Sequence, residues 1–136
     1  MKVENAVYPG SEQIAGFFGA PEDGPFVMVN LLKFKDKAEY ADGSNADLTG
    51  REAYALYGDA VSLLVEGLGG KIHYSGSVTG ILLGEVEDLW DMVALAEYPS
   101  LEAFRKMAMS PEMHAIEHHR TAGLAGQLNI RTKPRV

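Results

Sequence analysis

The sequence contains no cysteine. It therefore offers no disulfide, no thiolate nucleophile, and no cysteine ligand for zinc or an iron–sulfur cluster. It also lacks any apolar run near the ~20 residues that a membrane-spanning helix needs, so we expect no membrane partner. Any chemistry must come from other side chains.

Basic residues are outnumbered. The chain has 12 Lys and Arg against 19 Asp and Glu, for a formal net charge of −7. This balance argues against the phosphate attraction that drives nucleic-acid binding, so the sequence predicts no nucleic-acid partner. Glu4 and a Pro-Gly pair stand where a signal peptide needs its apolar stretch. We therefore expect a cytoplasmic protein.

No internal repeat, low-complexity tract or long linker divides the 136 residues. One domain of this length buries roughly two-thirds of the surface that its unfolded chain exposes. We predict a single domain over residues 1–136, with an N-terminal helical extension over residues 1–24. In that extension Ser11 is the expected cap of a helix that runs to Phe18.

The first strand and the first long helix of the domain have clear signals. Residues Phe26 to Lys35 (FVMVNLLKFK) are β-branched, aromatic and almost uninterruptedly apolar, which predicts a strand covered on both faces. Thr49 and Glu52 form a capping box that starts a helix. Apolar residues at three- and four-residue steps give this helix one buried stripe. They are Tyr54, Tyr57, Val61, Leu64 and Leu68.

The second half of the chain completes an α+β pattern. Residues Lys71 to Gly84 read as one long strand or two shorter ones, and a strand over about Trp90–Tyr98 follows. Ser100 and Ser110 each start a short helix. A last strand covers about Gln127–Thr132. The order β-α-β-β-α-β, with the second helix split, is the ferredoxin-like arrangement, an antiparallel sheet with helices on one face.

This arrangement leaves one apolar face of the sheet without a cover. With helices on one side only, the first strand presents Val27, Val29 and Leu31 on the other side. Antiparallel sheets normally carry polar residues on such a face. We therefore predict a homodimer in which the sheet of a partner covers it.

Six stretches along the chain carry a family resemblance. They are VNLLKFK (29–35), GREAYALYG (50–58), WD (90–91), YPS (98–100), SPEM (110–113) and HHRTAGLAG (118–126). Together they resemble the domain-of-unknown-function family numbered thirteen-thirty, in the dimeric α+β barrel superfamily. The resemblance covers nearly all of the chain from about Pro25 onward. It implies a ferredoxin-like fold and dimerisation, but no reaction, because the superfamily includes cofactor-free monooxygenases, lactone isomerases and haem-dependent peroxidases.

One histidine cluster matches a metal motif. His114, Glu117 and His118 fit the H-x-x-E-H spacing of inverted zinc peptidases, but those enzymes need a downstream carboxylate and no acidic residue follows Glu117. Some haem-binding relatives in the superfamily use a histidine of a C-terminal helix, which is where His118 and His119 lie. The alternative for His119 and Arg120 is favourable positive charge in a last helical turn. We predict no metal, no haem and no other cofactor.

Asn30 is the candidate that the pattern singles out. It interrupts an apolar strand, where a buried amide must find hydrogen bonds or cost ~1–3 kcal/mol. By alternation it shares a face with bulky apolar residues and points toward a cavity between sheet and helix, where Tyr54 also points. An asparagine that ties together a backbone bulge is the alternative.

Four further residues are candidates for a ligand pocket. Tyr40 is the only aromatic of the long loop over residues 36–48 and is the candidate to close over a ligand. Trp90 is a candidate pocket wall, with core anchoring as the alternative. His119 and Arg120 complete the set.

The sequence thus predicts a homodimer that binds a small organic molecule. The catalytic hypothesis is a cofactor-free oxygenase or isomerase with tyrosine or histidine as acid or base. The alternative is a non-catalytic ligand-binding or structural dimer module.

Overall fold

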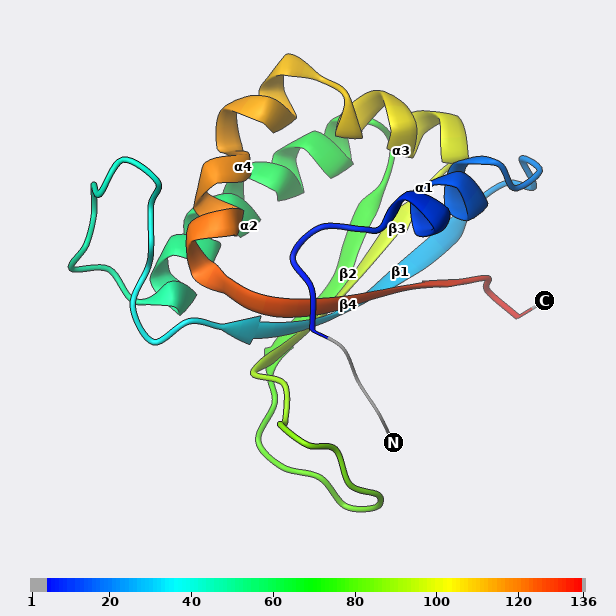
Figure 1. Cartoon of the computed structure of the whole chain (residues 1–136). Helices are drawn as coiled ribbons and strands as arrows, with labels where there is room; N and C mark the ends of the chain where they lie inside the picture. Colours follow the sequence, from blue (N-terminus) through cyan, green and yellow to red (C-terminus); the bar gives the residue numbers. More distant parts are fainter. Residues whose placement is uncertain (1–4, 136) are drawn as a thin grey trace.

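A computed structural model describes residues 5–135 and shows an antiparallel sheet beneath a layer of helices (Figure 1). The strands are β1 (Phe26–Phe34), β2 (Lys71–Ser77), β3 (Met92–Tyr98) and β4 (Leu124–Thr132). Their order in the sheet is β2-β3-β1-β4, so the most apolar strand is central. This is the ferredoxin-like topology, and the fold prediction is confirmed.

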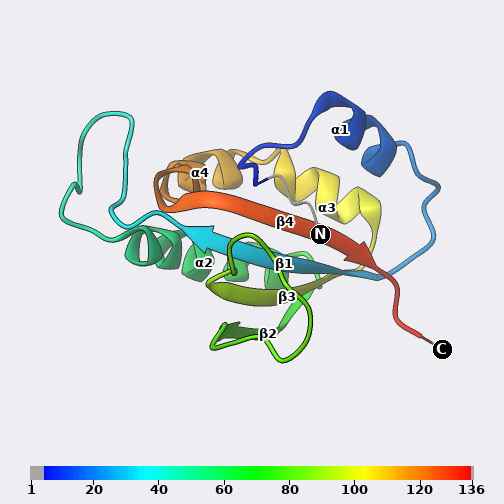
Figure 2. The same ribbon diagram turned by 60° about the horizontal axis from the view of Figure 1, so that its bottom comes forward.

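The helices all lie on one side of the sheet. They are α1 (Ser11–Phe18), α2 (Gly50–Gly67), α3 (Leu101–Ala108) and α4 (Pro111–Gly123). Figures 1 and 2 show α2, α3 and α4 over the sheet and α1 beside α3. Within residues 5–135, no helix combines the length and apolar character needed to cross a membrane.

Side chains cap the helices at the serine and threonine positions that the sequence indicates. Thr49 Oγ1 accepts from the Glu52 backbone N–H at 3.0 Å, and Glu52 Oε1 accepts from the Thr49 N–H at 2.9 Å. This reciprocal pair satisfies two amide donors that a helix end leaves free. At α1 the prediction is off by one residue. Gly10 is the cap, with its N–H bonded to Gln13 Oε1 at 2.9 Å, and Ser11 is the first helical residue.

Residues 71–84, expected to form one long strand or two shorter ones, contain a single short strand. It ends at Ser77, and residues 78–91 form a loop that projects beyond the sheet on the side away from the helices (Figure 1). The β2–β3 ladder ends at the pair Ser77–Met92, with one further bond from Val78 N to Asp91 O at 2.9 Å. On the other side, Asp91 Oδ2 accepts from the backbone N–H of Phe34 in β1 at 2.8 Å. The next strand accordingly starts at Met92 rather than at Trp90.

The last strand starts earlier than predicted, at Leu124 rather than Gln127. Leu124 pairs with Phe34 after a register shift between Lys33 and Phe34. No register shift occurs at Asn30, so a backbone bulge does not account for that residue.

The core lies between β1 and the helices. Phe26, Met28 and Leu32 face the helices from β1 and are at most 4% exposed. Each fully buried side chain of this kind contributes about 1.5–3 kcal/mol. Phe17 of α1 joins the core through Phe26 and Phe104, at ring distances of 6.0 Å and 5.2 Å. These aromatic contacts fix α1 against the sheet.

Two glycines let α2 and α4 touch through their backbones. A Cβ on Gly50 would lie 2.1 Å from the carbonyl oxygen of Lys35 and 2.7 Å from that of Gly123. A Cβ on Gly123 would lie 2.4 Å from the Gly50 oxygen. The same junction carries hydrogen bonds from Lys35 N to Gly123 O and from Gly50 N to Lys35 O, at 2.8 Å and 3.1 Å. Only glycine fits at either position, and the junction sets the first turn of α2, with Tyr54, against the sheet.

The face of the sheet opposite the helices is apolar along its centre. Val29 has Leu95 and Ile130 as its cross-strand neighbours, and Leu31 has Val93 and Leu128. These side chains are half-buried or exposed. Below, this surface is called the open face, defined as Val27, Val29, Leu31, Val93, Leu95, Leu128 and Ile130.

Candidate functional site

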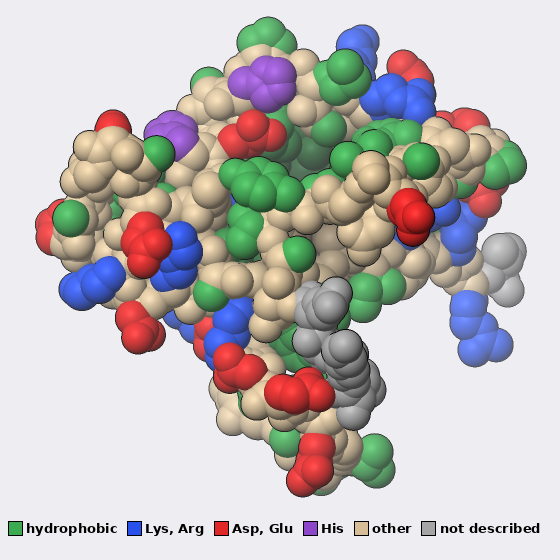
Figure 3. Space-filling view, viewed as in Figure 1, with side chains coloured by type: hydrophobic (Ala, Val, Ile, Leu, Met, Phe, Trp, Pro, Cys, Tyr) green, Lys and Arg blue, Asp and Glu red, His purple; other side chains and the backbone are tan. Residues whose placement is uncertain are grey.

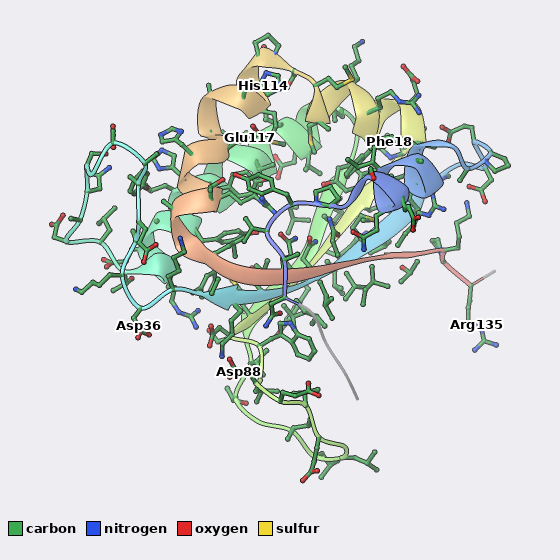
Figure 4. The ribbon with its side chains drawn as sticks, in the orientation of Figure 1. Phe18, Asp36, Asp88, His114, Glu117 and Arg135 are labelled. Carbon is green, nitrogen blue, oxygen red and sulfur yellow. The ribbon has the colours of Figure 1, made fainter. Side chains whose placement is uncertain are left out.

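A cavity of about 1030 Å³ lies between the helices and the sheet. Residues of β1, β3 and β4 line it on the sheet side, α2 and α4 on the helix side, and Val7, Tyr8 and Pro9 on its flank. Figure 3 shows an apolar recess at this place. In Figure 4 Glu117 lies on one side of the recess and Phe18 on the other. The volume suits a small organic ligand.

The structure brings three of the six predicted site residues together. Asn30, Tyr54 and Arg120 line the cavity, from β1, α2 and α4 respectively. Tyr40, His119 and Trp90 are not among its lining residues.

Asn30 lies on the sheet side of the cavity with all of its amide hydrogens engaged. Its Nδ2 donates to the carbonyl oxygens of Met28 and Ala94, at 3.4 Å and 3.3 Å. Its Oδ1 accepts from Gln127 Nε2 at 2.8 Å. Because the protein uses both donors, Asn30 holds its neighbours in place rather than offering a free N–H to a ligand.

Gln127 links Asn30 to Arg120. The Arg120 Nη2 donates to Gln127 Oε1 at 2.7 Å, and the Gln127 backbone N–H donates to Ala6 O at 2.9 Å. Sequence reasoning missed Gln127. Its alternation with Asn129 along β4 was the pattern that could have indicated it. The sequence does not reveal the register that places both residues beside β1.

Tyr54 presents its hydroxyl to the cavity. Its ring packs at 5.4 Å from both Phe34 and Tyr57. The hydroxyl has no hydrogen-bond partner among residues 5–135. Burial is the main cause that raises the pKa of Tyr54 above its usual value, so the phenol stays neutral at physiological pH. A neutral phenol without a protein partner is available as a donor or acceptor for a ligand.

Two more tyrosines line the same space. Burial raises the pKa of Tyr57 and of Tyr98 as well. The Tyr57 hydroxyl donates weakly to Met113 Sδ at 3.8 Å. None of these phenols is suited to act as a base near neutral pH, because each resists ionisation.

Tyr40 and His119 form a pair of their own beside the cavity. The Tyr40 hydroxyl lies 2.6 Å from His119 Nδ1, and the His118 ring lies 5.9 Å from the Tyr40 ring. Burial first, and then the neighbouring His118, lowers the pKa of His119, while burial raises the pKa of Tyr40. The Tyr40 hydroxyl and the neutral imidazole of His119 share this hydrogen bond. The pair attaches the 36–48 loop to α4, and Tyr40 is only 8% exposed. Tyr40 therefore does not cover the cavity.

Trp90 lies two residues before β3. Its indole Nε1 is buried, and no acceptor for it exists among residues 5–135.

The histidine motif of α4 reaches the cavity. His114, Glu117 and His118 all contribute to its lining. Within residues 5–135, no group of three or more His, Asp or Glu side chains is arranged to hold a metal ion. That no metal is bound stays a prediction.

The chain is similar to several solved structures. The RPA0582 protein of Rhodopseudomonas palustris, described as of unknown function, is 35% identical, with 98% of this chain and 99% of that chain covered and a TM-score of 0.86. Its methylated form is 36% identical with a TM-score of 0.88, over 97% and 96% of the two chains.

Two more distant structures share the fold alone. A dimeric ferredoxin-like protein of Thermobifida fusca is 16% identical with a TM-score of 0.52, over 80% of this chain and 90% of that chain. A DABB-family protein with a ferredoxin-like fold from Mesorhizobium loti is 13% identical with a TM-score of 0.51, over 84% and 100%.

No protein-family model and no curated protein matches the sequence. The near-complete overlap at 35% identity is decisive. The chain belongs to the family of the Rhodopseudomonas palustris RPA0582 protein, which has the ferredoxin-like fold.

Proposed function

We propose that the protein is a homodimer that binds a small organic molecule in the cavity between its helices and its sheet. The observation that carries the proposal is the cavity itself, about 1030 Å³ and lined by apolar side chains together with polar ones from the sheet, α2 and α4. Ligand sites are built in this way, since apolar walls supply the binding energy and a few polar groups orient the ligand.

The proposal of a dimer is based on the apolar open face. A stable interface usually buries about 800 Å² on each partner, and an exposed apolar surface of this kind marks an interaction site. The projecting 78–91 loop supports the same arrangement, because it lies on the same side of the sheet in Figure 2 and carries exposed apolar side chains at its tip. These are Ile81, Leu82 and Leu83, at 53%, 102% and 88% exposure. The Thermobifida fusca protein of this fold is described as dimeric.

We also propose that this family is the domain-of-unknown-function family numbered thirteen-thirty, and that residues 1–136 form one cytoplasmic domain. The six stretches that carry the resemblance support the first statement. The contacts of α1 with the core support a single domain, because they attach the N-terminal extension to the rest of the fold.

A screen of small organic molecules by thermal shift, followed by titration calorimetry, tests the binding function. We expect a hit to bind the parent, and to bind Tyr54→Phe and Asn30→Leu more weakly. Tyr74→Phe is the matched control, since Tyr74 is 59% exposed and is absent from the cavity lining. If hits bind all four proteins alike, the ligand does not occupy this cavity.

A second candidate is cofactor-free catalysis, as an oxygenase or isomerase. The observation that favours it is the presence of His114 and His118 in the cavity lining, because histidine is the usual acid or base near neutral pH. Mass spectrometry of each hit after incubation with the protein distinguishes the two functions. A product that forms with the parent and is lost in His118→Gln supports catalysis, whereas unchanged hits support binding alone.

A further inference from the structure

The cavity contains a cation without an anionic partner. Arg120 lines it, yet none of the ion pairs among residues 5–135 includes Arg120. A guanidinium carries five N–H donors in a planar fork. Its one hydrogen bond within the described chain goes from Nη2 to Gln127 Oε1. The other N–H groups have no acceptor among the described side chains and carbonyls.

The guanidinium is held in place rather than free to turn away. Gln127 Oε1 accepts from it at 2.7 Å, and Gln127 Nε2 is itself bound to Asn30 at 2.8 Å. Asn30 in turn holds two backbone carbonyls. Arg120 is thus attached to the central strand of the sheet through two amides. A fixed guanidinium loses less conformational entropy when it binds an anion.

No negative charge is paired with Arg120. The carboxylates that line the cavity are Glu39, Asp59 and Glu117, and none of them forms an ion pair with Arg120. The adjacent phenols of Tyr54 and Tyr57 stay neutral, because burial raises the pKa of each. Glu117, one turn earlier on α4, is exposed and forms no ion pair with Arg120. A charge beside apolar walls is costly unless an opposite charge pairs with it.

The other arginine of the cavity wall is already engaged. The Arg51 guanidinium stacks over the Phe34 ring at 4.9 Å, and its Nη1 donates to Ser77 Oγ at 3.3 Å. Arg51 likewise forms no ion pair, but its contacts hold it against Phe34 and Ser77, so Arg120 is the cavity arginine with a free guanidinium edge. One such edge pairs with one carboxylate. The protein as a whole carries −7, which disfavours a multiply charged ligand such as a phosphate monoester.

We propose that the ligand is a small monocarboxylic acid in its ionised form. Its carboxylate takes the free edge of the Arg120 fork in a two-point hydrogen bond, the geometry that a guanidinium offers to a carboxylate. Its apolar body lies against Met92 and Ala94 of β3 and against Tyr54 of α2. This inference rests on the proposed small-molecule function and names the class of molecule.

The test uses matched pairs that differ only in charge. Benzoate, cinnamate and octanoate are each compared with the corresponding primary amide, by titration calorimetry at pH 7 against the full-length protein. We expect at least one acid to bind at least about 10-fold more tightly than its amide, the effect of losing a charge-assisted hydrogen bond. An amide that binds as well as its acid overturns the inference but leaves the binding function standing. If no acid and no amide binds, both fail.

Variants locate the carboxylate. Arg120→Met keeps an apolar stem and is expected to weaken acid binding about 10-fold or more. Arg135→Met is the control and is expected to leave acid binding unchanged, because Arg135 is exposed and is not among the lining residues of the cavity. Glu117→Gln removes the nearby negative charge and is expected to maintain or strengthen acid binding. Arg120→Lys keeps the charge, so it shows whether weaker binding by Arg120→Met comes from the lost guanidinium or from a folding defect. We expect it to bind acids more weakly than the parent, because an ammonium lacks the fork. Acid affinity unchanged in both Arg120 variants overturns the inference.

Discussion

The side-chain amide of Gln127 on β4 donates a 2.8 Å hydrogen bond to the amide oxygen of Asn30 on β1. The orientation of both amides is determined by the ends of the network. A guanidinium only donates, and backbone carbonyls only accept, so hydrogen bonds run from Arg120 through Gln127 and Asn30 to the carbonyls of Met28 and Ala94. Asn30 is therefore a positioning residue for Arg120.

A double-mutant cycle measures this coupling. Gln127→Leu leaves Asn30 Oδ1 and the Arg120 guanidinium without their partner, and we expect the free energy of unfolding to fall by ~1–3 kcal/mol. Adding Asn30→Leu to that variant should cost less than Asn30→Leu alone, with a coupling of about 0.5–1.5 kcal/mol. Urea unfolding of the four proteins gives the cycle. Strictly additive losses would mean that the network does not act as a unit.

The glycine junction predicts opposite results for two glycines of α2. Gly50→Ala places a Cβ 2.1 Å from a backbone oxygen, and overpacking of this kind costs about 1–3 kcal/mol or more. In Gly58→Ala the nearest atom is Tyr54 Cε1 at 4.0 Å, so the helix should gain about 0.5–1 kcal/mol. The urea midpoints of the two variants are compared with that of the parent. A Gly50→Ala protein as stable as the parent would contradict the close backbone packing at this junction.

Two tyrosine-to-phenylalanine changes separate a ligand-facing hydroxyl from a structural one. Tyr40→Phe removes the bond to His119 at 2.6 Å, and we expect a loss of ~0.5–1.5 kcal/mol. Tyr54→Phe removes a hydroxyl with no partner among residues 5–135, and we expect stability to change by less than about 0.5 kcal/mol. Thermal and urea unfolding measure both. A larger loss in Tyr54→Phe than in Tyr40→Phe would reverse the two roles.

His119 makes stability depend on pH in one direction. Burial and the neighbouring His118 lower the pKa of His119 in the folded state, so below the unfolded pKa of about 6.5 the unfolded chain binds more protons. The stabilisation is present at pH 7.5 and is lost as the pH falls through the lowered folded pKa. We expect the free energy of unfolding to decline between pH 7.5 and 5 and the decline to be smaller in His119→Gln. An identical slope in the variant would assign the effect to other groups.

The open face predicts the oligomeric state. Val29 lies at its centre, between Leu95 and Ile130, and Val29→Glu places a charge in the proposed interface. We expect light scattering to give a dimer for the parent and a monomer for Val29→Glu at micromolar concentration. Leu63→Glu is the control, because Leu63 is 70% exposed on α2. A parent that is a monomer at this concentration contradicts the proposal directly.

The elements that the sequence predicts correctly are those with local signals. The Thr49–Glu52 capping box and the serine caps at Ser100 and Ser110 act within one helical turn, so their geometry follows from neighbouring residues. Residues 71–84, whose pattern predicts one long strand or two shorter ones, are suited to a strand throughout, but only Lys71–Ser77 forms one. Its end depends on its pairing with β3, which stops at Ser77–Met92 and is set by residues elsewhere in the chain.

The same distinction applies to the cavity. Alternation along β1 places Asn30 toward the helices, and helical periodicity places Tyr54 toward the sheet, so both are accessible to sequence reasoning. Gln127 becomes visible only when the register of β4 against β1 is known. Tyr40 was predicted to close over a ligand because it is the only aromatic of its loop. Its pairing with His119 arises from a contact 79 positions away, which no local pattern reveals.

The central position of β1 also governs the order of folding. β1 is followed along the chain by α2 and β2, but its two neighbours in the sheet are β3 and β4. Val27 and Thr132, which share a hydrogen bond at its outer end, are 105 positions apart. Such long-range pairing is slow because loop closure precedes any gain from contacts. During synthesis, the most apolar strand therefore leaves the ribosome before β3 and β4, and we expect α2 or a chaperone to shield it until they follow.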